Sequence, residues 1–420
     1  MTPIPHPRFR HGWWLAAVVG AACDPAPAGP GVDARLADAA AAVDAIDGPP
    51  ADAPVAPALP PLLLDPSFDD DGGYQFGPGY AGRVTTSGDR IELCGTATHE
   101  AGAVIYTDAG FSFRTTPGAS ESVLALWPYP APTTVVANCS ASALDPDGTS
   151  VTLFHALSWP TRTYMLARRE LDGTYHGATP SPATTAVVDL HALGNHQTAM
   201  VATDAVWLLD PQLAPVASFG AGGRLPLDGE ARWSTRPHTA APRIDVVTTT
   251  SLVRIDPATG ARDPAFGVGG AVALPPIVTY GVAPLPGGGE LIVSEGLGLE
   301  VSVTGAVTSV ALPARRPSAV VEDRAGGAYL VWTRDEYPVE FTVTRVAPVA
   351  PGVWGDGGSQ PVVPPELCPI QTATDCWDWL QVVDARWSAT GKLAISLQRH
   401  THFVWEQGRG HNAQLVVLTR

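Results

Sequence analysis

Short apolar segments that follow polar, glycine-containing turns recur along the chain from residue 62 to residue 420. The clearest copies are 289–293, 327–331 and 391–395, where a glycine leads into a run of apolar residues. Short strands at regular spacing, bounded by Gly, Pro and Asp turns, are typical of antiparallel sheet. The pattern therefore predicts an all-β domain over 62–420.

A longer motif joins these segments into a repeat. A short strand such as 252–257 runs into an Asp-Pro turn, and an aromatic residue followed by a glycine pair comes next, as in 263–270. Phe219 and Phe266 lie roughly 45 residues apart, and Trp354 lies about twice that distance further on, which fits the size of a four-stranded propeller blade. We expect the aromatic ring to pack between neighbouring blades and the glycines to form a turn with positive φ.

The repeats predict a β-propeller of seven four-stranded blades. The blades are expected to begin near Tyr80, Ser122, Thr185, Arg232, Val278, Pro317 and Leu380. Six or eight blades are alternatives, because the units near 120–176 and 278–313 are eroded, and an open solenoid is the alternative architecture. The segment 364–379 is interpreted as an insertion between blades.

The two ends of the repeat region each carry half of the motif. Residues 62–68 match its second half, as seen at 263–266, and residues 415–420 match its first half, as seen at 252–256. One repeat is therefore split between the ends. This predicts a closed ring in which N- and C-terminal strands pair, which removes the exposed edges of an open array.

The first sixty residues have the features of an export signal and a spacer. A basic start precedes the apolar run 13–22, which is shorter than the roughly 20 residues of a membrane-spanning helix. The run ends in Gly-Ala-Ala before Cys23, as in a bacterial lipobox, although the usual leucine is missing. We predict a signal peptide over 1–22, then lipidated Cys23 and a disordered Ala/Pro/Asp-rich linker over 23–61. A plain secreted protein is the alternative.

Composition and charge exclude several classes of protein. The 43 glycines and 42 prolines rule out a long coiled coil or a helical bundle. The formal net charge of -16, with Lys392 as the single lysine, argues against nucleic-acid binding. We expect a monomer in the cell envelope, facing the periplasm or the cell surface, that contacts the membrane only through its lipid anchor.

The remaining cysteines are even in number. Cys368 and Cys376 are close together in a Pro-containing, loop-like segment, which predicts a local disulfide in an oxidising compartment. Cys94 and Cys139 would then form the second bridge. A zinc site is the alternative, but the chain has no C-x-x-C spacing.

The repeat resembles the delta-60 family of bacterial repeats, in which a strand and a D-P or D-G turn precede an aromatic residue and a glycine pair. The best copies are 263–270 and 218–223, and 64–68 also fits. The resemblance covers most of 62–420. It implies a propeller-like fold in an exported, often surface-associated protein, and it brings no catalytic residues with it.

Two clusters could hold a metal ion, although no cofactor is expected. His400 and His402 would share one face of a strand, and His411 could approach from a partner strand to complete a zinc site. The acidic loop with Asp69 and Asp71 could bind Ca²⁺. Solvated strand and turn positions are the alternative for both, and turn chemistry alone accounts for the similar segment 145–148.

These observations favour a binding platform for a protein or glycan ligand over an enzyme. A propeller presents its loops on two rigid faces around a channel, and Trp377 and Trp379 could stack on a sugar or a peptide. The alternative is a metal- or carboxylate-dependent hydrolase or lyase that acts at the channel mouth. The chain has neither a G-x-S-x-G motif nor a phosphate-binding loop.

Overall fold

The chain divides into two units, Met1–Ala53 and Pro54–Arg420, and the second is described here. The structure is a computed structural model that describes residues 57–65, 73–101, 104–115, 123–126, 136–158, 161–170, 175–235, 242–313, 315–323, 325–333, 340–364, 376–403 and 408–419. Cys23, Asp69, Asp71 and Cys368 lie outside these ranges. Within them, no helix has the length and hydropathy needed to cross a membrane.

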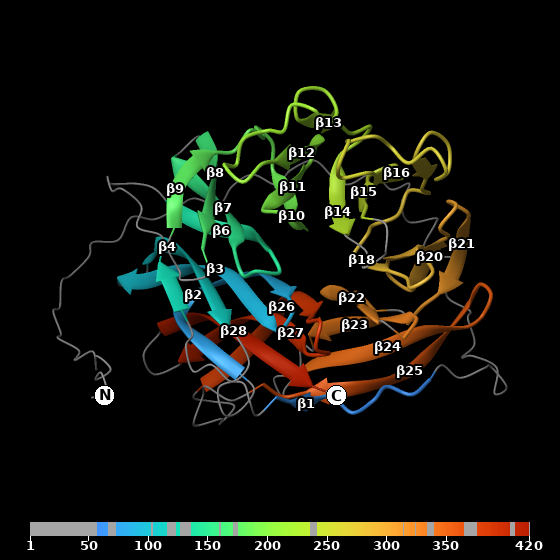
Figure 1. Cartoon of the computed structure of the whole chain (residues 1–420). Coiled ribbons are helices and arrows are strands. Elements are labelled where there is room, and N and C mark those ends of the chain that lie inside the picture. The colour runs from blue at the N-terminus through green and yellow to red at the C-terminus, as the bar shows by residue number, and fades with distance from the viewer. Residues whose placement is uncertain are drawn as a thin grey trace, which may run out of the picture. The chain divides into compact units, whose positions relative to one another are not determined.

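The described secondary structure of the second unit consists of antiparallel strands arranged around a ring (Figure 1). Five sheets have four strands each. The first two are β6 (Val136–Leu144), β7 (Ser150–Ser158), β8 (Thr161–Arg169) and β9 (Tyr175–Pro180), then β10 (Val187–Gly194), β11 (Gln197–Ala202), β12 (Ala205–Leu209) and β13 (Arg224–Pro226). The next is β14 (Ala231–Thr235), β15 (Ile244–Thr248), β16 (Ser251–Ile255) and β17 (Ala271–Ala273). The last two are β18 (Gly281–Pro284), β19 (Glu290–Val293), β20 (Leu297–Val301) and β21 (Val307–Ala311), then β22 (Ala319–Asp323), β23 (Gly327–Thr333), β24 (Phe341–Ala350) and β25 (Val353–Val362).

The sixth sheet has eight strands and contains both ends of the described chain. Its strands are β1 (Leu63–Leu64), β2 (Gly73–Ser87), β3 (Arg90–Ala101), β4 (Val104–Thr115), β5 (Val123–Leu126), β26 (Cys376–Trp387), β27 (Leu393–Phe403) and β28 (Gly408–Thr419). Strand β2 joins the two halves of this sheet, because residues 73–78 pair with β28 and residues 79–87 pair with β3.

The all-β propeller arrangement is confirmed, but the prediction of seven separate four-stranded blades is wrong. The described strands form six sheets, five of four strands and one of eight. The reason is the length of β2, whose 15 residues are enough to bond to a different neighbour along each half. The expected boundary between the last and first repeats is therefore bridged by one continuous strand.

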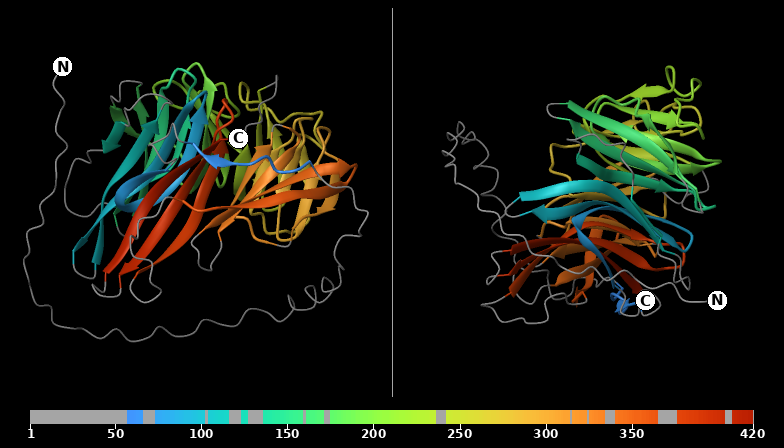
Figure 2. Two further views of the ribbon diagram at one scale, coloured as in Figure 1. Left: turned by 90° about the horizontal axis from the view of Figure 1, so that it is seen from below. Right: turned by 90° about the vertical axis from the view of Figure 1, so that its left-hand side faces the viewer.

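The expected pairing of the two chain ends is present. Leu63 lies opposite Thr419 and Leu64 opposite Leu418, so β1 adds to β28 as an antiparallel strand. The Lys392 ammonium lies 2.5 Å from a carboxylate oxygen of Asp65, directly after β1. In both views of Figure 2 the blue segment near the start of the described chain lies beside the red C-terminal strands. Ring closure thus rests on backbone hydrogen bonds between the ends.

The aromatic residues of the repeat pack between neighbouring sheets, as predicted. Phe219 is fully buried among side chains from β11 and β12 on one side and β14, β15 and β16 on the other. Phe266 fills the same position between the next two sheets. The glycine pair that follows it, Gly269 and Gly270, has φ values of 62° and 82°, the left-handed region expected for this turn.

Two expected boundaries differ from the structure. The blade start near Ser122 is wrong, since Val123–Leu126 is β5, an outer strand paired with β4, and the next inner strand, β6, begins at Val136. The insertion expected over 364–379 includes the start of β26, since Cys376, Trp377 and Trp379 pair with β27. In both regions the repeat motif is incomplete, so the local sequence did not show where a blade begins.

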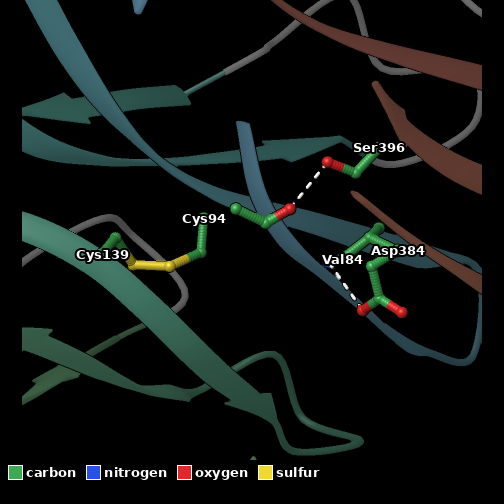
Figure 3. The surroundings of a disulfide bond; sticks show 6 residues. Val84, Cys94, Cys139, Asp384 and Ser396 are labelled. Carbon is green, nitrogen blue, oxygen red and sulfur yellow. Dashed lines mark hydrogen bonds between the residues drawn. A yellow bond between two sulfur atoms is a disulfide. The ribbon is translucent and has the colours of Figure 1, made fainter. Parts of the chain in front are cut away.

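A disulfide joins Cys94 on β3 to Cys139 on β6, and so links the eight-stranded sheet to its neighbour (Figure 3). Both cysteines are buried, and their Cα atoms are 5.5 Å apart. Close by, the Ser396 hydroxyl donates to the Gly82 carbonyl at 2.6 Å and the Val84 amide donates to an Asp384 carboxylate oxygen at 3.3 Å. These bonds hold β2 against β26 and β27. The partner expected for Cys376 lies outside the described residues.

Candidate functional site

The centre of the ring contains a polar cavity of about 170 Å³. The inner strands contact one another in the order β2, β6, β10, β14, β18, β22 and β26, and β26 contacts β2 again. Each four-stranded sheet supplies one of these strands and the eight-stranded sheet supplies two. The charged and hydroxyl-bearing residues of the lining are Arg83, Thr85, Thr86, Ser142, Asp189, His191, Ser234, Thr235, Glu322 and Arg386.

Asp189 on β10 is the buried acid of this cavity. Its Oδ2 atom lies 3.1 Å from Arg83 Nη1 on β2 and 3.5 Å from Arg386 Nη2 on β26. Its Oδ1 atom accepts a hydrogen bond from the Leu190 amide at 2.9 Å. The Asp189 side chain is 7% exposed, whereas those of Arg83 and Arg386 are 28% and 34% exposed. The two guanidinium groups are therefore the positive charges of this cluster that a ligand in the channel can reach.

A second carboxylate, Asp384 on β26, lies beside the same guanidinium group of Arg386. Its Oδ2 atom is 3.7 Å from Arg386 Nε and accepts the Val84 amide, while its Oδ1 atom accepts the Ala385 amide at 2.9 Å. Burial raises the pKa of Asp384, and the charge of Asp189 adds to this effect. Burial also acts to raise the pKa of Asp189, but the charges of Arg83, His191 and Arg386 outweigh it and the pKa is lowered. The pKa of Asp384 is therefore raised, whereas the pKa of Asp189 is lowered.

A histidine and a serine meet across two neighbouring sheets of the same cavity. His191 Nε2 on β10 lies 2.8 Å from Ser234 Oγ on β14. His191 follows Asp189 by two residues, so both side chains lie on the same face of β10. The pair gives the cavity a polar wall that can donate and accept hydrogen bonds.

Of the residues predicted from the sequence to bind metal, the structure places the backbone of two, His400 and His402. Asp69 and Asp71 lie outside the described residues. His400 and His402 lie on β27, where His400 pairs with His411 and His402 pairs with Arg409 across β28. The backbone register therefore places His400 opposite His411, the histidine that the sequence suggested as a third ligand.

The residues of the cavity were missed because no local motif marks them. Asp189 interrupts the apolar run 187–190, and Arg83 and Arg386 precede Val84 and Trp387 in strands that are otherwise largely apolar. A charge inside the first strand of a repeat is the available signal, because that strand lines the channel of a propeller. This signal can be used only if the first residue of each repeat is assigned correctly, and the start assigned near Ser122 was wrong.

Comparison with known proteins finds similar solved structures but no matching family. No protein family matches the chain, and no curated protein matches its sequence. Virginiamycin B lyase from Staphylococcus aureus is similar in structure, at 9% identity over 82% of this chain and 98% of that one, with a TM-score of 0.47. YCF48 in complex with D1 peptide aligns at 11% identity over 84% and 86%, with a TM-score of 0.34. Pyrococcus horikoshii acylaminoacyl peptidase aligns at 9% identity over 79% and 52%, with a TM-score of 0.41.

Proposed function

We propose that this chain is an exported lipoprotein whose propeller binds a protein or glycan ligand at the mouth of its central channel. The observation that carries the proposal is the pair of partly exposed guanidinium groups, Arg83 and Arg386, held in place by buried Asp189. Guanidinium groups fixed in this way bind carboxylates and other planar polar groups with defined geometry.

The size of the cavity limits how much of a ligand can enter. Its volume of about 170 Å³ is below the roughly 300–1,000 Å³ of pockets that enclose a whole drug-sized molecule. We expect one end of a larger ligand to enter, such as a carboxylate-bearing side chain, a chain terminus or a single sugar unit. The rest of the ligand would contact the loops around the channel.

Binding is tested with immobilised peptide and glycan arrays probed by the full chain. The matched variants are Arg83→Gln and Arg386→Gln, with Arg232→Gln as the control, since Arg232 pairs with Glu230 on the surface. The proposal predicts a selective set of bound probes that both channel variants lose and the control keeps. Binding that all three variants retain would place the ligand elsewhere, and an absence of selective binding would contradict the platform.

The anchor and location form a separate part of the proposal. A lipidated Cys23 would anchor the chain in the membrane. The spacer that follows it, to residue 61, would connect this anchor to the propeller on the periplasmic or cell-surface side. Expression in a bacterial host with an alkyne-bearing fatty acid tests this directly. Labelling of the wild-type chain and its loss in Cys23→Ser supports the anchor, whereas equal labelling or none contradicts it.

The second candidate is a carboxylate-dependent hydrolase or lyase at the same channel. It is favoured by the opposite pKa shifts of Asp384 and Asp189, because a pair of acids driven apart in acidity can serve as proton donor and acceptor. A panel of chromogenic esters and glycosides, read as a pH–rate profile, tests it. A turnover that Asp384→Asn abolishes and Asp228→Asn leaves intact would support catalysis, and no turnover on any substrate would count against it.

A further inference from the structure

Two turns from neighbouring sheets bring three metal-binding side chains together outside the central channel. Asp145 and Asp147 lie in the turn between β6 and β7, and His196 lies in the two-residue turn between β10 and β11. One ligand atom from each side chain lies within 4.8 Å of the other two. His196 Nε2 is 3.5 Å from Asp147 Oδ2, and His196 Nδ1 is 3.9 Å from Asp145 Oδ2.

Backbone hydrogen bonds fix both turns. The Asp145 amide donates to the Thr149 carbonyl at 2.8 Å, and the Thr149 amide donates to Asp147 Oδ1 at 2.9 Å. His196 has a φ of 59°, in the left-handed region, and its carbonyl accepts a hydrogen bond from Arg168 Nη2 at 2.7 Å. The imidazole is therefore held beside the two carboxylates before any ligand binds.

The buried acid of this group lacks a donor for one of its oxygens. Asp145 is 3% exposed, and its Oδ1 atom is buried without a hydrogen-bond partner among the described residues. His196 Nδ1 is also buried and forms no hydrogen bond to the residues that the structure describes, although it lies 3.9 Å from Asp145 Oδ2. Burying such a polar atom without a partner costs roughly 1–3 kcal/mol, and more when the group is charged. An ion that binds through Asp145 Oδ1 or His196 Nδ1 would supply the missing interaction.

We propose that Asp145, Asp147 and His196 bind a divalent transition-metal ion. Two carboxylates and one imidazole form a mixed oxygen and nitrogen ligand set, which suits Zn²⁺ or Mn²⁺, whereas Ca²⁺ takes oxygen ligands alone. The distances between the ligand atoms allow one ion to contact all three, since such bonds are about 2.0–2.2 Å long and small side-chain shifts suffice.

Nearby positive charges limit the affinity of these three residues for a metal ion, and an adjoining cleft leaves room for a further ligand of that ion. The charge of Arg168 acts on Asp145 and that of Arg90 acts on Asp147, which offsets part of the negative charge. A cleft of about 460 Å³ lies beside His196 and Arg168. Water or a small anion from this cleft can complete the coordination of the ion.

Metal stoichiometry of the full chain tests the proposal. Wild-type protein and three variants are dialysed against Zn²⁺, and bound metal is measured by elemental analysis. The variants are Asp147→Asn, His196→Asn and the control His176→Gln. Asn is chosen at 196 because it tolerates the left-handed backbone, and Asn at 147 keeps an oxygen for the Thr149 amide. His176 lines the same cleft but pairs with Glu170.

We expect wild type and the control to bind one more equivalent of zinc than Asp147→Asn and His196→Asn do. Cobalt in place of zinc should give visible absorption bands that the same two variants lose. Equal stoichiometry in all four proteins would overturn the proposal. A fifth protein, His400→Gln, is measured in the same way, and loss of the equivalent in that variant alone would also overturn the proposal, because the ion would then lie on β27. Circular dichroism confirms that each variant is folded.

Discussion

Asp189 and Arg386 face each other across the central channel, with 3.5 Å between Oδ2 and Nη2. They lie on β10 and β26, two strands that are not neighbours in the ring. Arg83 on β2 reaches the same oxygen at 3.1 Å. One buried carboxylate therefore connects strands from three places around the channel and sets the positions of the two reachable positive charges.

Replacing this carboxylate tests its structural role. We expect Asp189→Asn to lower the free energy of unfolding at pH 7 by about 1–3 kcal/mol, because two partly buried guanidinium groups lose their partner. The folded state lowers the pKa of Asp189, so its contribution is present above the ordinary aspartate pKa and is lost as the pH falls below it. Urea unfolding at pH 7 and pH 3 should show the difference between wild type and variant shrinking at pH 3.

Asp228→Asn is the matched control for this experiment. Asp228 is an exposed aspartate that pairs with Arg262, and its loss should change stability by less than about 0.5 kcal/mol. An equal effect of the two substitutions would show that the channel carboxylate does not hold the arginines.

Glu290 on β19 should respond to pH in the opposite sense. Burial, and then the charge of nearby Asp245, raises the pKa of Glu290 well above its ordinary value. The folded protein therefore holds this proton more tightly than the unfolded chain, and stability is lost as the pH rises above the ordinary glutamate pKa. Glu290→Gln should be more stable than wild type at pH 8 by about 1 kcal/mol or more, with the gap closing toward pH 5.

The measurement is again urea unfolding across this pH range. Glu295→Gln serves as control, since Glu295 lies on the surface beside Arg316. A variant that is less stable than wild type at pH 8 would show that the Glu290 carboxylate is charged and needed in the fold.

Phe266 should be one of the most costly positions of the repeat to truncate. The ring is fully buried between two sheets, and the Arg254 guanidinium lies 3.9 Å from its centre. Phe266→Ala should lower the free energy of unfolding by about 3–5 kcal/mol. Val268, two residues later, is 90% exposed, and Val268→Ala should leave stability nearly unchanged. Similar melting temperatures for the two variants would contradict the packing role.

Gly82 should not tolerate a side chain beside the disulfide. A Cβ atom at this position would lie 2.3 Å from the Cys94 carbonyl oxygen and 3.0 Å from that of Cys139. Backbone cannot move aside cheaply, so Gly82→Ala should cost roughly 1–3 kcal/mol. Gly287, where no atom lies within 4 Å of an added Cβ, is the control. Thermal unfolding of Gly82→Ala and Gly287→Ala compares them, and equal melting temperatures would contradict the close approach.

The parts of the fold that could be predicted from the sequence are those with a local pattern. Phe219 and Phe266 share a motif with their flanking glycines, so their packing between sheets followed from the repeat. The matching half-repeats at the ends predicted that the terminal strands pair, as β1 and β28 do. The double use of β2 could not be predicted in this way, because the Gly-Pro-Gly sequence at 77–79, where β2 changes partner, is typical of a turn between two strands.

The candidate sites depend on neighbours that are distant along the chain. Arg83, Asp189 and Arg386 meet only because their strands all face the channel, and no spacing rule connects them. Asp145 and Asp147 were interpreted as turn residues, which their hydrogen bonds to Thr149 support. Their proximity to His196 arises from the packing of one sheet against the next, which a single turn cannot reveal.

The shared strand β2 also determines the order in which parts of its sheet can form as the chain is made. Gly73 lies opposite Val416, so residues 73–78 of the first long strand cannot form their hydrogen bonds until β28, one of the last parts of the chain, has been made. Pairings between distant parts of the chain form late, because the chain must lose the conformational entropy of loop closure before the new contact stabilises it. Until residues 408–419 have been synthesised, residues 73–78 of β2 remain an open strand edge.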